Sequence, residues 1–323
     1  MRKTSVTYKN KKNIVVIGGG TGAFTVLSGL KKYNHNLSAI VSMADDGGST
    51  GVLREEFGIL PPGDIRRCLV ALSHSDKVLA DLFNYRFKEG GVRGHSFGNL
   101  LITAFERMNG SFEKAIEHAG KILGVEGDII PVALENTRLW AKLENGQIIK
   151  GETNIDIPKH NGNLKIKEVY LKPKVSANSR AKMAIAEADL IILGPGDLYT
   201  SIIPNLLVRG ISGAIKKSKA KKVYVCNLMT KFGETNEFSA KDFARELERY
   251  LGENVINIVV FNNKKPSPQR LKKYAEEKAV FVDCNLKDFW QEGFTVVLAD
   301  LLRARGFLRH DPGKLARTLT SLI

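Results

Sequence analysis

Two adjacent carboxylates are the residues most suited to chemistry in this chain. Asp45 and Asp46 stand directly before a second glycine-rich stretch, Gly47-Gly48-Ser49-Thr50-Gly51. Carboxylate oxygens can hold Mg²⁺ against a diphosphate, and a free carboxylate can act on an acceptor hydroxyl. Asp45 and Asp46 are therefore candidates for catalysis and for a Mg²⁺ site, with Gly47, Gly48 and Ser49 as ligand contacts. The alternative is a solvated Asp-Gly turn.

A glycine cluster near the N-terminus predicts a phosphate-binding turn. The apolar run from Asn13 to Ile17 leads into the cluster, and the apolar-patterned stretch Ala23–Leu30 follows it. The spacing Gly18-x-Gly20-x-x-Ala23 fits the dinucleotide fingerprint of strand, tight turn and helix. The N–H groups at the start of such a helix suit a phosphate. The candidate contacts are Gly18, Gly19, Gly20, Thr21 and Gly22. A glycine turn needed only for tight packing is the alternative.

Two later strands end in the same kind of loop. Asp189–Leu193 and Lys222–Cys226 are short buried-strand patterns, each followed by polar residues. Parallel strands in an open α/β sheet end at one edge, where ligands bind. We therefore expect these loops to meet the Gly18–Gly22 and Asp45–Gly51 segments in one nucleotide or phosphoester cleft. The candidate contacts are Gly194, Pro195, Gly196, Asp197, Thr200, Ser201, Asn227 and Thr230.

Two other polar segments contribute candidates. Asp64 is predicted to cap a helix over residues 65–72, and Arg66 with Arg67 in its first turn would favour a bound anion, because the helix dipole there disfavours cations. His95 is a candidate acid/base group or phosphate donor, and equally a satisfied structural donor. The further candidates in these segments are Asp64, Arg66, His95, Ser96 and Asn99.

The element pattern predicts one α/β domain over residues 13–323, after a basic tail over residues 1–12. Residues 138–150 form a predicted hairpin around Asn145-Gly146, and with an edge strand at 165–171 they make a small β insertion at about 138–171. Residues 151–163 are expected to be a loop. Further core strands are expected at 255–261 and 279–282. The predicted fold is a Rossmann-like, doubly wound, mainly parallel sheet.

The composition is that of an ordinary globular chain with an excess of positive charge. Forty-nine Lys and Arg against 34 Asp and Glu leave +15, and 43% of the residues are hydrophobic. The basic runs lack interleaved aromatic residues, so nucleic-acid binding is disfavoured relative to an anionic small ligand or a solvated surface. We find neither a membrane-length apolar run nor a signal peptide, so a cytoplasmic protein is expected. The three separated cysteines indicate buried thiols rather than a metal site.

Basic residues crowd the C-terminal region. Arg303, Arg305, Arg309 and His310 are placed between a predicted helix ending at Ala304 and a last helix capped by Asp311. Such crowding favours a bound anion, and Arg309 is the candidate contact to the diphosphate of a ligand. Solvated charges at a helix end are the alternative.

In combination, five segments resemble the YvcK branch of the CofD/YvcK family over nearly the whole chain. These segments are Gly18–Gly22, Ala44–Ser49, Pro62–Arg67, His95–Asn99 and Gly194–Asn205. The resemblance implies a Rossmann-like, cytoplasmic bacterial gluconeogenesis factor, linked to growth on gluconeogenic carbon, to cell shape and to UDP-sugar binding. It attaches no firm catalytic activity. A UDP-sugar ligand and a regulatory protein partner are therefore expected, and a homo-oligomer is left open.

The other branch of that family implies an alternative function. Its members are 2-phospho-L-lactate transferases that use a guanylyl-activated donor, a deazaflavin acceptor and Mg²⁺, and Asp46 matches an acid at their acceptor site. An enzyme of this type would use Asp45 or Asp46 with Mg²⁺. An NAD(P)-like ligand is the third interpretation. Asp197 stands where the YvcK pattern more often has serine, and a carboxylate there repels phosphate unless a cation intervenes.

Overall fold

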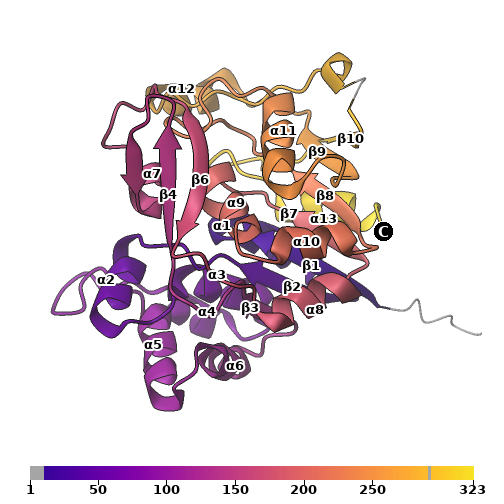
Figure 1. Ribbon diagram of the computed structural model, residues 1–323. Helices are drawn as coiled ribbons and strands as arrows, with labels where there is room; N and C mark the ends of the chain where they lie inside the picture. The colour runs from indigo at the N-terminus through magenta and orange to yellow at the C-terminus, as the bar shows by residue number, and fades with distance from the viewer. Residues whose placement is uncertain (1–10, 290–291) are drawn as a thin grey trace, which may run out of the picture.

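A seven-stranded parallel sheet forms the centre of the computed structural model, which describes residues 11–289 and 292–323 (Figure 1). The strand order is β10-β9-β8-β7-β1-β2-β3. This order confirms the doubly wound, Rossmann-like prediction, while all but the last two residues of the predicted basic tail lie outside the described residues. The strands are β1 Lys12–Gly18, β2 His35–Val41, β3 Asp128–Pro131, β7 Leu190–Leu193, β8 Lys221–Val225, β9 Ile258–Asn262 and β10 Thr295–Ala299.

Helices cover both faces of this sheet. Helices α1, α3 and α13 pack together on one face, and α8, α10 and α11 lie on the other (Figure 1). Both faces of the sheet are therefore shielded from water. This is why β1 and β7 are continuous apolar runs and do not alternate between apolar and polar residues. The helices are α1 Gly20–Leu30, α2 Gly48–Phe57, α3 Pro62–Leu72, α4 Lys77–Asn84, α5 Phe97–Asn109, α6 Phe112–Ile122, α8 Ser179–Glu187, α9 Ile203–Leu206, α10 Ile211–Lys217, α11 Ala240–Leu251, α12 Pro268–Glu276 and α13 Pro312–Thr320.

The predicted β insertion is a separate antiparallel sheet, in the order β5-β4-β6. Its strands are β4 Arg138–Leu143, β5 Ile148–Lys150 and β6 Ile166–Lys172, and the Asn-Gly hairpin is confirmed. The segment 151–163 is not only a loop, because it contains a short helix, α7, at Glu152–Asp156. This helix forms because the Asp46 carboxylate accepts hydrogen bonds from the backbone N–H groups of Glu152 and Thr153, at 3.2 and 2.9 Å.

Two predictions for the C-terminal part are wrong. Residues 279–282 form no strand of the sheet, and Phe281 only bridges to Met229. The last strand is instead β10, in place of the predicted helix ending at Ala304. Its β-branched run pairs with β9, which offers an edge that a helix could not satisfy. The final helix is confirmed, with the Asp311 side chain accepting from Lys314 N at 2.9 Å.

In the described part of the chain, no helix has both the length and the apolar character needed to cross a membrane. Cys68 and Cys226 are buried and Cys284 is half-buried, and all three are free thiols.

Candidate functional site

The glycine loops meet where the strand order reverses. β1 lies between β2 and β7, so the connections after β1 and after β7 run in opposite directions and open a crevice between them. A Cβ placed on Gly22 would lie 1.8 Å from the carbonyl oxygen of Pro195, so the two loops are in backbone contact. The predicted convergence of Gly18–Gly22 with Gly194–Asp197 at one edge is confirmed.

Two adjoining cavities open at this edge. The first, of about 500 Å³, we call the glycine cleft. The second, of about 690 Å³, we call the side cavity. They share wall residues from four segments of the chain, namely Thr21, Gly22, Asp156, Ile157, Gly196, Asp197 and Lys231.

Most of the candidate residues line one of these cavities. The glycine cleft is lined by Gly19, Gly20, Thr21, Gly22, Asp45, Gly47, Gly48, Ser49, Asp64, Arg66, Asn99, Gly196, Asp197, Thr200 and Ser201. The side cavity is lined by Pro195, Asn227, Thr230 and Arg309. Gly18, Asp46, His95, Ser96 and Gly194 are in the walls of neither.

The two adjacent acids face different neighbours. Asp45 is half-buried beside the glycine cleft, where its Oδ1 accepts from Gly47 N at 2.9 Å, and desolvation raises its pKa. Asp46 points away from the cleft, towards α7 and Arg138. In the described residues, the group of three or more possible metal ligands whose atoms all lie within 4.8 Å of one another is Asp156, Asp197 and Glu234, which includes neither Asp45 nor Asp46. A Mg²⁺ site at Asp45 and Asp46 stays a prediction.

Asp64 faces the first glycine loop rather than capping a helix. Helix α3 begins earlier than predicted, at Pro62, so Asp64 lies inside its first turn. A Cβ on Gly19 would lie 2.4 Å from Asp64 Oδ2, so any larger residue there would displace the Asp64 carboxyl group. Desolvation, followed by the charge of Asp45, raises the pKa of Asp64 to about 7.

The two arginines of this helix have different roles. Arg66 is buried, and its guanidinium donates to the side chains of Asn99 and Asn84. Arg67 instead reaches the glycine loop, with its Nη1 3.4 Å from Thr21 Oγ1. Arg67 was not among the candidate contacts, yet it lines the glycine cleft together with Arg66 and is the one of the two that reaches the glycine loop.

His95, Ser96 and Asn99 position Ser49 at the cleft. Ser96 is the N-cap of α5, accepting from Asn99 N at 3.3 Å. His95 Nδ1 and Asn99 Nδ2 lie 3.0 and 3.2 Å from Ser49 Oγ. His95 and Ser96 therefore stand behind the cavity wall.

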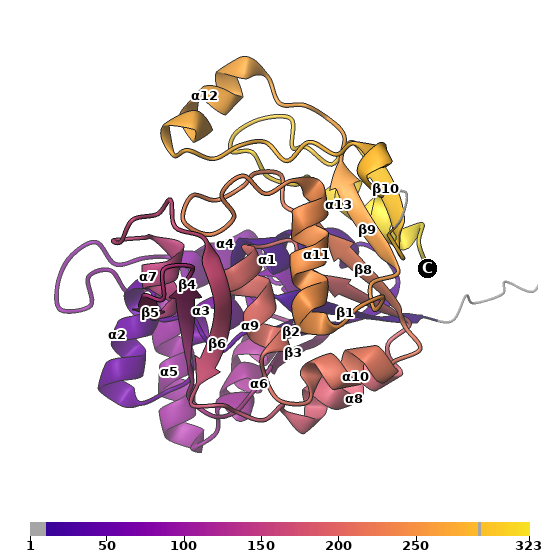
Figure 2. The same ribbon diagram turned by 45° about the horizontal axis from the view of Figure 1, so that its top comes forward.

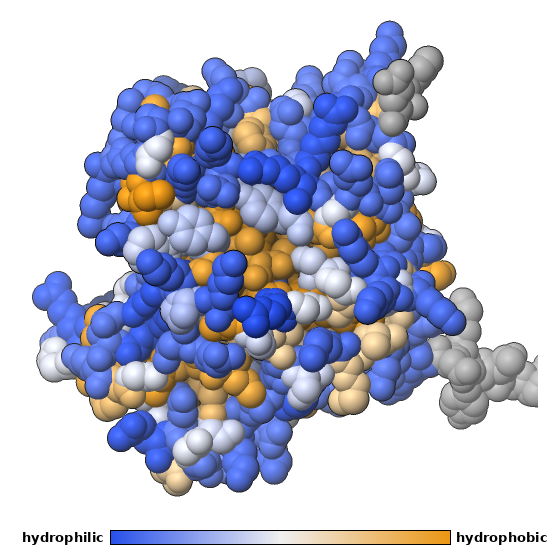
Figure 3. Space-filling view, in the orientation of Figure 1, coloured by the Kyte–Doolittle hydropathy of each residue, from blue (hydrophilic) through white to orange (hydrophobic). Residues whose placement is uncertain are grey.

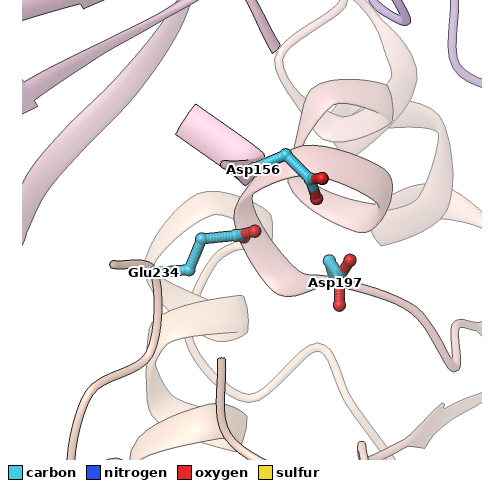
Figure 4. A group of neighbouring side chains, drawn as sticks. All are labelled: Asp156, Asp197 and Glu234. Atoms are coloured by element: carbon cyan, nitrogen blue, oxygen red, sulfur yellow. The ribbon is translucent and has the colours of Figure 1, made fainter. Parts of the chain in front are cut away.

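A half-buried lysine among three carboxylates was missed by the sequence analysis. Lys231 Nζ contacts Asp156, lies 2.9 Å from Asp197 Oδ2 and lies 3.3 Å from Glu234 Oε1. Figure 4 shows the three carboxyl groups facing one another. Burial raises the pKa of Glu234 to about 8. Lys231 is the cation that offsets the negative charge of Asp197 at the cleft.

The group of positively charged residues near the C-terminus has fewer members than predicted. His310 is buried, and desolvation lowers its pKa to about 4, so the ring is neutral at pH 7. Arg303, Arg305 and Arg309 are exposed and follow a strand, so they are not placed at the C-terminal end of a helix, where the dipole would favour them. Arg309 nevertheless lies in the wall of the side cavity, as its proposed role requires.

The acids of the glycine cleft predict proton uptake on binding an anion. Burial, followed by the charges of nearby acids, raises the pKa of Glu152 to about 9, and that of Asp64 is about 7. A phosphate placed beside Asp64 raises this pKa further, because it disfavours the carboxylate. Binding of UDP without Mg²⁺ at pH 7.5 should therefore take up about half a proton or more. Calorimetry in buffers of different ionisation enthalpy measures this uptake, and a heat independent of buffer contradicts it.

The fold and its cleft define a doubly wound α/β protein whose glycine loops meet at the strand switch point. The sequence also identifies the family of the chain. Residues 14–302 match the family described as "2-phospho-L-lactate transferase CofD", and the chain belongs to this CofD family.

Relatives place it beside the gluconeogenesis factors, as the resemblance implies. The chain is 47% identical over 316 residues to a "Putative gluconeogenesis factor" of Nostoc sp., covering 97% of this chain and 68% of that protein. It is 40% identical to the "Gluconeogenesis factor" of Bacillus subtilis, covering 97% and 98%. A crystal structure of a upf0052-family protein from Bacillus halodurans has a TM-score of 0.92 at 39% identity, covering 96% and 99%.

Proposed function

We propose that this protein is a cytoplasmic regulator that binds a UDP-sugar, supports growth on gluconeogenic carbon and cell shape, and acts through a protein partner. The observation that carries the proposal is the backbone contact between the two glycine loops over a cavity that opens into a second one. Glycine loops at helix starts suit a diphosphate, and Arg67 adds positive charge beside them. The names of the relatives support the link to gluconeogenesis.

The two cavities suit the two parts of such a ligand. The diphosphate fits where the glycine cleft joins the side cavity, beside the glycine loops, so that Arg309 in the wall of the side cavity can contact it. A sugar or base fits the side cavity, whose walls include apolar residues such as Leu228, Phe232 and Leu308. Volumes of about 500 and 690 Å³ lie in the range usual for small-molecule pockets, roughly 300–1,000 Å³.

A thermal-shift and calorimetry panel tests the ligand class. It compares UDP-N-acetylglucosamine, UDP-glucuronate, GDP, NAD and NADP, each with and without Mg²⁺. The UDP-sugars should raise the melting temperature most, and the intact UDP-sugar should be recovered after long incubation. Stabilisation by NAD alone, or by none of these, contradicts the proposal.

Arg309→Ala should weaken UDP-sugar binding at least about tenfold, because a charge-assisted contact to a diphosphate contributes about 1.5–3 kcal/mol. Arg305→Ala is the matched control. It removes another exposed arginine of the same loop that is not in the wall of either cavity, and should change the affinity less than about twofold. Equal affinities for both variants, measured by calorimetry, count against a role for Arg309.

A second candidate function is a transferase of the 2-phospho-L-lactate type. The match to that family model over residues 14–302 favours it, together with Asp45 in the cleft wall. In that case Asp45→Asn should abolish the Mg²⁺-dependent part of nucleotide affinity, and the donor should be consumed on incubation with an acceptor. Asp46→Asn is the comparison, since Asp46 bonds to α7 instead.

A further inference from the structure

A small unit outside the main core covers the side cavity. It consists of residues 264–278, which include α12, and residues 302–310, and we call it the basic flap (Figures 1 and 2). Helix α12 has no fully buried residue. A hydrophobic cluster separate from the core of the sheet joins the flap to the loop after β8. It is formed by Leu271, Tyr274, Leu302 and Leu308 of the flap with Leu228 and Met229 of that loop.

Side-chain contacts join the two segments of the flap. The Arg270 guanidinium donates to the carbonyl oxygens of Arg303 at 2.9 Å and of Gly306 and Phe307 at 3.2 Å. The Tyr274 hydroxyl accepts from Leu308 N at 2.9 Å. The segments therefore present one continuous outer face.

This face carries much of the positive charge of the molecule. The flap contains nine Lys and Arg against two Glu, which leaves +7 of the +15 of the whole chain. Within the described residues, its exposed Lys264, Lys272, Lys273, Arg303 and Arg305 form no ion pair. Cations gathered without counterions attract an anionic partner.

An exposed aromatic ring lies within this charge. Phe307 is 58% exposed. Lys273 Nζ lies 5.0 Å from the centre of its ring, and the Arg309 guanidinium carbon lies 5.4 Å from it. Aromatic residues and arginine are the side chains enriched in protein–protein interfaces, so Phe307 beside Arg309 is suited to bind a protein.

We propose that the outer face of the basic flap docks an acidic segment of a partner protein, with Phe307 as its apolar anchor. The carboxylates of the partner pair with the unpaired cations, and an apolar side chain packs on Phe307. This part of the inference stands independently of the identity of the ligand.

The features of the flap favour a protein over a nucleic acid or a membrane. Within the flap Phe307 is the only exposed aromatic residue, so successive bases have no row of rings on which to stack, and Glu276 and Glu277 repel phosphates. The surface over α12 is mainly hydrophilic in Figure 3, and the exposed residues of this helix form no apolar stripe of the kind that an interfacial helix needs.

The same flap connects the partner surface to the ligand. Tyr274, Glu277, Leu308 and Arg309 line the side cavity from the inside. A ligand that contacts this inner wall changes the free energy of the flap, and by linkage the partner then changes the affinity for the ligand. This coupling rests on the proposed UDP-sugar function.

The test measures binding of a fluorescein-labelled peptide rich in glutamate and leucine by fluorescence anisotropy, at about 0.15 M salt. Lys272→Glu/Lys273→Glu should weaken binding about tenfold or more, since four units of charge change at the docking face. Lys216→Glu/Lys217→Glu is the matched control, with the same charge change at the end of α10, and its effect should stay below about twofold. Phe307→Ala, which alters no charge, should also weaken binding.

Further measurements decide among the alternatives. If both double variants lose peptide affinity equally, the proposed docking face is wrong. It is also wrong if a labelled oligonucleotide or an anionic phosphatidylglycerol vesicle binds to the protein more tightly than the peptide does. Addition of UDP-N-acetylglucosamine should change the peptide affinity. If it does not, while Lys272→Glu/Lys273→Glu still loses the peptide, the docking face is supported and the coupling fails. Purified Lys272→Glu/Lys273→Glu protein should bind UDP-sugar normally. In cells that lack their own gluconeogenesis factor, however, the same variant should fail to restore growth on gluconeogenic carbon. Restored growth contradicts the proposal.

Discussion

Gly22→Ala should abolish nucleotide binding and lower the free energy of unfolding by about 3 kcal/mol. The added methyl group would lie 1.8 Å from the Pro195 carbonyl oxygen and 2.6 Å from its carbonyl carbon. Backbone atoms cannot rotate away as a side chain can, so the two glycine loops must separate. Urea denaturation measures the stability, and calorimetry with UDP-N-acetylglucosamine measures the binding.

Gly213→Ala is the control for this substitution. Gly213 is also inside a helix, α10, and a Cβ added there would have nothing within 4 Å of it. It should stabilise the protein by up to about 1 kcal/mol, because alanine has the higher helix propensity. If Gly22→Ala is as stable as Gly213→Ala, the contact between the loops is looser than described.

Lys231→Met should lower the free energy of unfolding by about 3–5 kcal/mol at pH 7. Methionine keeps most of the volume but leaves Asp156, Asp197 and the fully buried Glu234 without their cation. Lys12→Met is the control. It breaks a surface pair with Asp189, which is 37% exposed, and should change the stability by less than about 1 kcal/mol.

The effect of Lys231→Met should increase above pH 8. The pKa of Glu234 is about 8, raised from 4.5 mainly by burial, and the charge of Lys231 holds it down. Without Lys231 it rises further. A carboxyl whose pKa is raised in the folded state lowers the free energy of unfolding as the pH rises above its unfolded-state pKa, and this loss continues until the pH has passed the folded-state pKa. A higher folded-state pKa in the variant therefore extends the loss to higher pH. The gap between the variant and the wild type should widen by up to about 1.4 kcal/mol per pH unit above pH 8. A gap that is small and independent of pH counts against the Lys231 cluster.

The sheet and its loops could be predicted because their signals are local. A buried strand followed by glycines, as in Ile14–Gly18 or Leu190–Gly194, fixes where the chain turns, and parallel strands bring such turns to one edge. The strand over Thr295–Ala299 was mistaken for part of a helix because a short apolar run has no period of its own. Only its pairing with β9 shows that this segment is a strand.

The charged interior of the site could not be predicted in the same way. Lys231 meets Asp156 from the insertion and Asp197 from the loop after β7, and nothing in the sequence links three such distant positions. Asp46 was predicted to contact a ligand, but its carboxylate is used to start α7. Polar partners across the fold depend on packing, which composition and spacing do not encode.

The position of β7 beside β1 also has a consequence for synthesis of the chain. Asn13 and Asp189, which join these two strands at their starts, are 176 positions apart. While the ribosome is still making the first half, β1 can pair with β2 but keeps its other edge open. An open apolar strand edge invites pairing with other chains. The nascent protein therefore carries an open apolar edge on β1, together with an unfinished glycine cleft, until the segment that contains β7 has left the ribosome.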